Sequence, residues 1–318
     1  MLLVVYFILT IIMIFSTDGF FNKFNIASIL GLSSIMGFLV LGEAIVILTG
    51  GIDISVGNIA SLSSVVCAWT MLKFNGIFPV AVVILICIIF SVLSGAFMGF
   101  INGFSIAKLG IPPIIATLGV FSISYGFAEY IFSAEPTYLV INSFSLAVRT
   151  KLFGIFPLSS VIFVIFAIII SLILERTRIG RHVYAIGGSK EAAFLSGIKN
   201  VKILIYCYVS SGILSAIGGL LLAGWIRVGD ARAASGYEFI AITAVIMGGI
   251  SLFGGEGNIW DAVLGILTLQ TIRKIIPRMQ ISTFYEEGII GVILLIAVAI
   301  NIINLQRKNI KIKNIESK

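Results

Sequence analysis

Long apolar runs, separated by short clusters of charge, glycine and proline, organise this chain of 318 residues. A helix needs about 20 apolar residues to cross a hydrocarbon core about 30 Å thick, and eight to ten runs meet that requirement. The pattern therefore predicts an all-α polytopic membrane protein with about ten transmembrane helices. The expected spans are residues 2–17, 27–49, 54–72, 77–98, 112–133, 157–174, 203–224, 238–252, 257–276 and 286–305.

Glycine interrupts several of these runs. The chain contains 33 glycines, and many recur inside apolar segments, where a missing side chain lets helices approach closely or lets one helix break. We therefore expect glycine-broken or re-entrant segments, and broken helices in a bundle usually line a path. The glycines expected at these breaks are Gly50, Gly51, Gly57, Gly254, Gly255 and Gly257.

Composition supports a membrane location. Hydrophobic residues make up 59% of the chain and charged residues 11%, whereas soluble domains average about 45–50% and about 25%. Lipid is therefore the expected outer solvent. The apolar run at 1–16 has no basic lead and no cleavage pattern after it, so we interpret it as a first span rather than a cleaved signal peptide.

The sequence offers little chemistry for an enzyme or a metal site. The three cysteines, Cys67, Cys87 and Cys207, lie in apolar runs without CxxC spacing, and the single histidine, His182, lies in a basic stretch. A GxxxxGK[ST] phosphate loop is absent from the sequence, as are the usual catalytic motifs. We therefore predict that this chain is not an enzyme and binds no metal, cofactor or nucleotide itself.

The basic residues serve as topology signals. They cluster beside apolar spans rather than among exposed aromatics, so the net charge of +7 does not indicate nucleic-acid binding. The loop at about 175–202 and the tail at 306–318 are strongly basic and are expected in the cytoplasm, within a single membrane domain over 1–318. By the same count Arg273, Lys274 and Arg278 lie outside, so either that loop is an exception or a neighbouring span is re-entrant.

Two acids fall within or beside apolar spans. An Asp at the centre of a membrane helix costs about 2.5–3.5 kcal/mol, so such groups are expected to face the interior, pair or cap a helix. Asp53 is expected to cap the helix that follows it, a role that is compatible with a contribution to a gate or substrate path. Glu43 either has a transport role or is a structural acid bonded to Ser33, Ser34 or Thr49.

A short helix is expected inside the basic loop. Gly187 and Gly188 free the chain, Ser189 can cap the helix, Glu191 suits its positive end and Gly197 can stop it. Its apolar face, Phe194, Leu195 and Ile198, needs a partner protein or the membrane surface to cover it. The residues of this candidate docking segment are Ser189, Glu191, Ala192, Ala193, Phe194, Leu195, Ser196, Gly197 and Ile198.

Four motifs in order resemble the permease subunits of bacterial ABC importers of the ribose, xylose, galactose and autoinducer-2 class. They are GGIDISVGNIASLSS (50–64), NGFSIAKLGIPPIIATLG (102–119), GRHVYAIGGSKEAAFLSGI (180–198) and GYEFIAITAVIMGGISLFGGEG (236–257). The chain departs from the family pattern at Asp261-Ala262, where a Gly-Thr pair is usual.

The resemblance implies a multi-pass protein of the bacterial inner membrane, paired with an identical or related permease. It implies a cytosolic ATPase, as separate subunits or in tandem, that holds ATP and Mg, and a periplasmic sugar-binding protein. The loop helix would be the coupling helix that docks on the ATPase.

We therefore expect a permease that imports a monosaccharide or related small polyol, with Glu43, Asp53, Ser55 and Asn102 on its path or gate. The alternative is an ion-coupled secondary transporter that uses Glu43 or Asp53 as its ion site.

Overall fold

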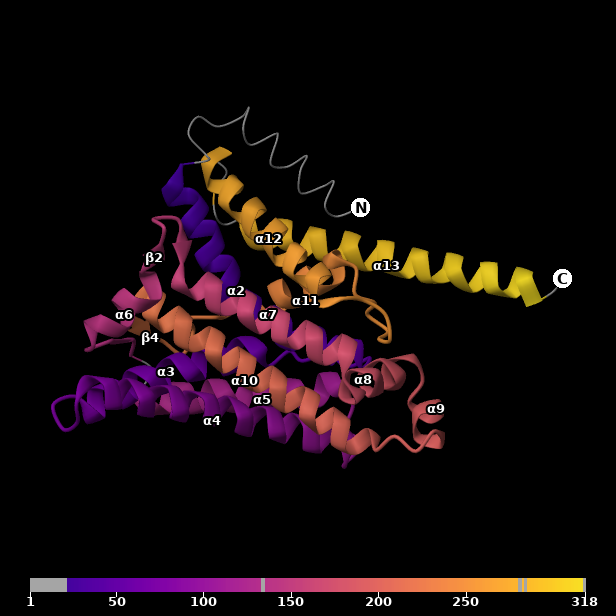
Figure 1. The fold of residues 1–318 in the computed structure, drawn as a ribbon, viewed down its shortest axis with the longest axis horizontal. Coiled ribbons are helices and arrows are strands. Elements are labelled where there is room, and N and C mark those ends of the chain that lie inside the picture. Colours follow the sequence, from indigo (N-terminus) through magenta and orange to yellow (C-terminus); the bar gives the residue numbers. More distant parts are fainter. Residues whose placement is uncertain (1–21, 133–134, 280–281, 283–284, 317–318) are drawn as a thin grey trace.

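The computed structural model describes residues 22–132, 135–279, 282 and 285–316. In this part of the chain nearly all regular structure is helical (Figure 1). The long helices are α2 (Lys23–Leu48), α3 (Val56–Phe74), α4 (Val80–Ala107), α5 (Pro113–Phe132), α7 (Leu158–Arg176), α10 (Asn200–Ile226), α12 (Ile259–Ile275) and α13 (Glu286–Glu316). The shorter ones are α6 (Asn142–Arg149), α8 (Arg178–Gly188), α9 (Lys190–Leu195) and α11 (Tyr237–Gly248), with a 3-10 turn at Ile276–Met279.

The predicted all-α membrane class is confirmed. Each expected span from 27–49 onward coincides with a helix, and the span expected at 2–17 lies outside the described residues. Within the described residues, 5 helices are long and apolar enough to cross a membrane, namely α2, α4, α5, α7 and α10. The total of eight to ten crossings remains a prediction.

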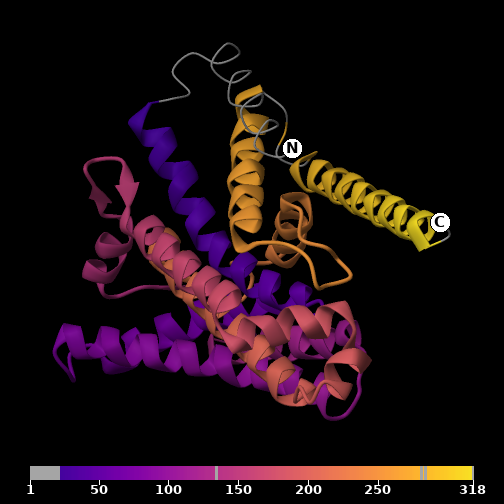
Figure 2. The same cartoon turned by 45° about the vertical axis from the view of Figure 1, so that its right-hand side comes forward.

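The helices differ in how much of their apolar surface the protein itself covers. Most of α2 is buried, whereas much of α4 and α7 is exposed, including Leu85, Leu93 and Phe97 on α4. Figures 1 and 2 show α3, α4 and α5 side by side as a layer, with α10 and α7 beside it and α2 and α12 rising from it. The exposed apolar faces are where lipid or a second protein would pack.

Glycine allows α10 to lie directly against its neighbours. A Cβ atom on Gly103 of α4 would lie 2.8 Å from the Cα of Ile205, and one on Gly99 would lie 2.9 Å from the Cα of Val209. Gly42 of α2 is similarly placed, with a would-be Cβ 3.0 Å from the Cα of Ser211. Close backbone contact of this kind is how membrane helices pack without large side chains between them.

One end of the bundle carries small elements that the sequence pattern did not predict. β1 (Thr137–Tyr138) pairs antiparallel with β4 (Val228–Gly229), and β2 (Lys151–Leu152) pairs with β3 (Phe156–Pro157). Together with α6 they lie at the end opposite α8 and α9 (Figure 1).

Candidate functional site

The break between α2 and α3 folds the chain back on itself. α2 ends at Leu48, and Gly50 turns the backbone with φ +75°, a conformation that favours glycine. The turn brings Asp53 back beside Glu43 in the last third of α2. The backbone N–H of Asp53 donates to Glu43 Oε1 over 3.1 Å.

Asp53 is the centre of a buried polar cluster that joins three helices to this break. Its Oδ1 accepts the N–H of Ser55 at 3.0 Å, the Ser55 hydroxyl, and Nδ2 of Asn102 in α4 at 3.3 Å. Nδ2 of Asn102 also lies 2.8 Å from Ser55 Oγ. Asp53 Oδ2 accepts the hydroxyl of Ser211 in α10 at 2.8 Å. We call Glu43, Asp53, Ser55, Asn102 and Ser211 the polar cluster.

The structure thus brings together the four residues predicted for the path or gate. Each is fully buried, with 0% relative exposure, so the polar cluster is sealed in this conformation. Sequence reasoning missed Ser211, because a serine in an apolar run carries no signal of its own. Whether the four residues act in transport remains a prediction.

Two of the sequence-based interpretations of the acids are corrected. Ser55, not Asp53, occupies the N-cap position of α3, and the Asp53 carboxylate accepts the N–H of that cap residue. Thr49 donates its hydroxyl to Val46 O and Ser34 donates to Gly31 O. Ser33 Oγ has no hydrogen-bond partner among the described residues, so none of the three is the partner expected for Glu43. The partner is the backbone of Asp53, which the turn at Gly50 presents.

The polar cluster holds two carboxylates without a cation. Among the described residues, no basic side chain lies within ion-pair distance of Glu43 or Asp53, and no group of three metal-binding side chains is present. Glu43 Oε2 and Asn102 Oδ1 are buried and have no hydrogen-bond partner there. Burying polar groups in this way is costly, so the arrangement points to a functional constraint rather than to packing alone.

Directly beyond the end of α2, three backbone segments touch with no side chain between them. The N–H of Gly255, between α11 and α12, donates to Leu48 O over 3.0 Å. A Cβ atom on Gly254 would lie 2.6 Å from Gly50 N and 2.9 Å from the Cα of Gly187 in α8. We call Gly50, Gly187, Gly254 and Gly255 the glycine junction. It joins the α2–α3 break, the end of α8 and the α11–α12 loop.

Tyr184 of α8 holds the same loop from a second side. Its hydroxyl donates to Gly257 O over 2.9 Å. Burial, together with the nearby carboxylates of Glu175 and Asp261, raises the pKa of the Tyr184 phenol. The hydroxyl therefore remains protonated and able to donate at neutral pH.

Most of the predicted glycine breaks lie between helices. Gly50, Gly254, Gly255 and Gly257 have positive φ, and Gly51 follows in the α2–α3 break. Gly57 differs, because it lies inside the first turn of α3. A Cβ there would lie 2.8 Å from Ala234 O, so this glycine serves close packing.

The expectation that Gly187 and Gly188 free the chain is also wrong. They are the last residues of α8. Position 187 requires glycine because a Cβ there would collide with the backbone of Leu48 and Gly255.

The predicted loop helix forms as α9. Ser189 is its N-cap and accepts the N–H of Ala192 at 3.2 Å, and Gly197 ends the turn with φ +81°. Phe194 and Leu195 are 69% and 84% exposed. Ile198 departs from the expected exposed face, because it is partly buried and packs on the main core.

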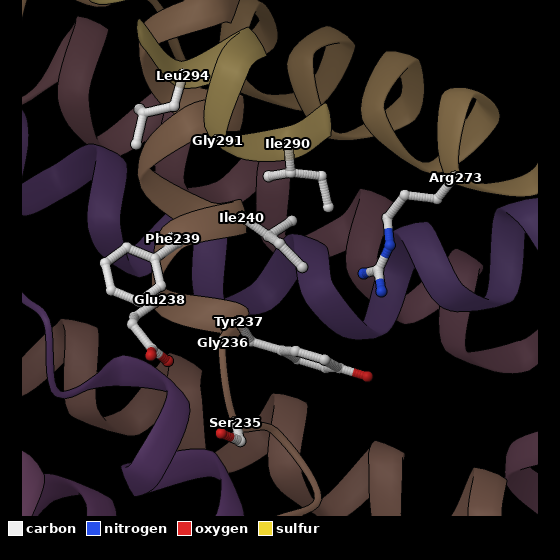
Figure 3. Close-up of a pocket in the computed structure, with 10 residues that line it drawn as sticks. All are labelled: Ser235, Gly236, Tyr237, Glu238, Phe239, Ile240, Arg273, Ile290, Gly291 and Leu294. Carbon is white, nitrogen blue, oxygen red and sulfur yellow. The ribbon is translucent and has the colours of Figure 1, made fainter. Parts of the chain in front are cut away.

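A cavity of about 440 Å³ lies where α11, α12 and α13 meet (Figure 3). None of the residues that line it belongs to the polar cluster. The residues around it are Ser235, Gly236, Tyr237, Glu238, Phe239, Ile240, Arg273, Ile290, Gly291 and Leu294. Sequence reasoning assigned none of them to a site, because their positions converge only in three dimensions.

Comparison with known proteins assigns the chain to a family. Residues 25–298 match the family described as the branched-chain amino acid transport system / permease component. The chain belongs to this permease family. No solved structure matches it.

Curated relatives cover almost the whole permease. The chain is 37% identical over 297 residues to the ribose import permease protein RbsC of Bacillus subtilis, covering 93% of this chain and 90% of the relative. It is 34% identical to the D-allose transport system permease protein AlsC of Escherichia coli, covering 93% and 90%. It is 35% identical to the galactose/methyl galactoside import permease protein MglC of Salmonella typhimurium, covering 96% and 94%.

Family and helices together indicate a multi-pass membrane protein. The ion-coupled alternative is not favoured, since the relatives named above are import or transport-system permeases.

Proposed function

We propose that this chain is the membrane-spanning permease subunit of an ATP-binding-cassette importer that moves a monosaccharide or related small polyol across the bacterial inner membrane. The observation that supports it most is similarity over nearly the full length to permeases named for ribose, allose and galactose. The exposed apolar pair on α9 is the physical feature that such a role requires.

Energy for transport has to come from partner subunits. Moving a two-state equilibrium from 1:99 to 99:1 requires about 5.5 kcal/mol of differential binding, and the sequence has no phosphate loop with which to extract it from a nucleotide. The proposal therefore includes a cytosolic ATPase that holds ATP and Mg, a second permease copy and a periplasmic sugar-binding protein. The C-terminal tail, 306–318, would face the cytoplasm with α9.

The ATPase would dock on Phe194 and Leu195. Their exposure leaves apolar area free for a groove, while Ala193 on the same short helix is 3% exposed and anchors it to the body of the permease. α9 is also tied to α10, since Asn200 Nδ2 donates to Lys190 O over 2.8 Å. A displacement of α9 would therefore move structured elements behind it.

From α9 the displacement has a short route into the membrane helices. α8 precedes α9 directly, and its Gly187 contacts the backbone of the α2–α3 break in the glycine junction. That break carries Asp53, whose hydrogen bonds hold α4 and α10. We propose that the polar cluster is a closed gate, and that Glu43, Asp53, Ser55 and Asn102 separate or exchange partners when the ATPase closes.

The test is co-purification from native membranes in mild detergent. Leu195→Asp places a charge on the docking pair, and Leu146→Asp makes the same change at an exposed position of α6, at the opposite end of the bundle. We expect the ATPase to be lost from Leu195→Asp and retained by Leu146→Asp.

Equal retention of the ATPase by both variants would contradict docking at α9. Sugar uptake by the isolated chain in ATP-free vesicles, driven by an ion gradient, would instead establish a secondary transporter.

A further inference from the structure

The cavity lies beside α11, part-way along the long helices, and its lining residues Ser235, Phe239 and Gly291 are exposed. α11 has 12 residues, about 18 Å at a rise of about 1.5 Å per residue, which is too short to cross a membrane. The loop before it descends along α3, where Ala234 N–H donates to Ser61 Oγ over 3.0 Å and Asp230 N–H to Ser64 Oγ over 3.3 Å. From Ser61 to Phe74, the end of α3, the helix rises roughly 20 Å.

Secondary transporters hold their solutes at a comparable depth. Their substrate sites lie near the middle of the bilayer and are formed by discontinuous helices whose ends turn toward the cavity. Gly236, with φ +83°, precedes α11 and turns the chain into it at the cavity wall. The wall is therefore partly backbone at the start of a short, interrupted helix.

The chemistry of the wall is mixed. Ser235 and Tyr237 supply hydroxyl groups, while Ile240, Ile290 and Leu294 supply apolar surface (Figure 3). Arg273 supplies a guanidinium with several N–H donors, of which Nη1 lies 3.6 Å from Met36 Sδ. A volume of about 440 Å³ is within the range of roughly 300–1,000 Å³ found for small-molecule sites.

A polar ring compound matches this wall best. A neutral polyhydroxylated ring presents oxygens that accept from hydroxyl and guanidinium donors, and C–H faces that pack on aromatic or aliphatic side chains. A metal cation is disfavoured by the charge of Arg273.

Glu238 is a wall residue whose Oε2 is buried and has no hydrogen-bond partner among the described residues. Its side chain is buried and turns toward α3, where a Cβ on Gly57 would collide with Oε2. We therefore do not count this carboxylate among the groups that face the cavity.

We infer that the cavity bounded by α11, α12 and α13 is the place where the transported monosaccharide contacts the permease, through Ser235, Tyr237 and Arg273. This inference rests on the proposed import function. It separates two tasks that the sequence assigned to one set of residues, because the polar cluster would close the route while the cavity receives the solute.

Protection from chemical labelling tests the site. Ser235 is exposed, and Ser235→Cys changes one atom, so a small methanethiosulfonate reagent can report on the cavity. The host has Cys67, Cys87 and Cys207 changed to Ala and is assembled with its ATPase and binding protein in proteoliposomes. Ser143→Cys, exposed on α6 at the far end of the bundle, is the matched control.

Ribose, allose, fructose and galactose are tested as protecting sugars at saturating concentration. The sugar that is taken up is expected to slow labelling of Ser235→Cys at least fivefold and to leave Ser143→Cys unchanged. Tyr237→Phe, which removes one hydroxyl, is expected to raise the KM for uptake of that sugar.

Two failures are distinguishable. If a sugar is taken up while labelling of Ser235→Cys proceeds at the same rate with and without it, the cavity assignment is overturned and the import function stands. If a fatty-acyl chain protects and no sugar does, the cavity is a lipid site. If none of the sugars is taken up by the complete assembly, the proposed function itself fails.

Discussion

Replacing Gly254 with alanine tests whether the glycine junction transmits motion. A Cβ at this position would lie 2.6 Å from Gly50 N, whereas ordinary contacts begin at 3.4 Å, so the two segments would have to separate by 0.8 Å (3.4 − 2.6). The neighbours are backbone atoms and cannot rotate away. The α11–α12 loop would therefore separate from the α2–α3 break and from the end of α8, which opens the glycine junction.

The free-energy cost has two parts. Gly254 has φ +86°, and a left-handed conformation costs an L-residue roughly 1–2 kcal/mol. Crowding a well-packed site typically costs a further 1–3 kcal/mol or so. Gly254→Ala is thus expected to lose about 2–5 kcal/mol of stability, unless the contact opens and releases the second part.

Two control variants separate these parts. Gly76→Ala introduces similar backbone strain at φ +81°, with nothing within 4 Å of the new Cβ. Gly188→Ala has neither positive φ nor a neighbour within 4 Å, although it adjoins the junction. The expected order of thermal unfolding midpoints in detergent is Gly188→Ala highest, then Gly76→Ala, then Gly254→Ala.

The functional assay is the number of ATP molecules hydrolysed per sugar taken up by proteoliposomes that contain the complete importer. Opening the junction should leave the ATPase bound at α9 and uncouple it from the membrane helices, so this ratio should rise severalfold in Gly254→Ala alone. A Gly254→Ala importer with the midpoint and the ratio of Gly76→Ala would refute the reasoning.

Three further predictions concern single contacts. Glu43→Gln keeps an acceptor for the Asp53 N–H, so uptake should stay within about twofold of the unchanged protein. Glu43→Leu leaves that buried donor without a partner, which costs about 1–3 kcal/mol of stability and lowers the unfolding midpoint. Loss of uptake in Glu43→Gln would contradict a role for Glu43 as hydrogen-bond acceptor. The sulfur atoms of Cys67 and Cys87 lie 3.1 Å apart. Oxidation with copper phenanthroline should therefore remove two electrons and two protons and form a disulfide between α3 and α4, which peptide mass spectrometry would detect. Two free thiols after treatment would contradict this prediction. Arg232 is an exposed partner of Glu129, so Arg232→Gln should not change the unfolding midpoint, and a clear drop would show that this surface pair matters.

The apolar pattern predicted the long helices because lipid imposes one requirement on every span. Each run that could satisfy its own backbone hydrogen bonds became a helix, from α2 to α13. The region 135–157 lacks that regularity, so its apolar pattern predicted neither α6 nor the strand β1 that pairs with β4. That pairing joins Thr137 to Gly229, and periodicity carries no information on contacts so distant in the chain.

The candidate site was predictable to the extent that a buried charge is conspicuous. Glu43 and Asp53 were identified because an acid in an apolar run is costly, and their partners Ser55 and Asn102 were polar residues at interruptions of the pattern. Ser211 resembled many serines in membrane helices. Gly187 was misassigned to a loop, since only the approach of two distant backbone segments shows why that position excludes a side chain.

In the proposed importer, the length and anchoring of α10 would allow it to report the state of one membrane face to the other. α10 has 27 residues and is about 40 Å long. At its first turn, Asn200 donates to the backbone of α9, and at its last turn the Nε–H of Arg149 donates to Trp225 O over 2.9 Å. Thermodynamic linkage is reciprocal. If ATP binding shifts this helix toward a state that releases the sugar-binding protein, docking of that protein must weaken ATP binding by the same factor, so nucleotide affinity measured inside would report occupancy outside.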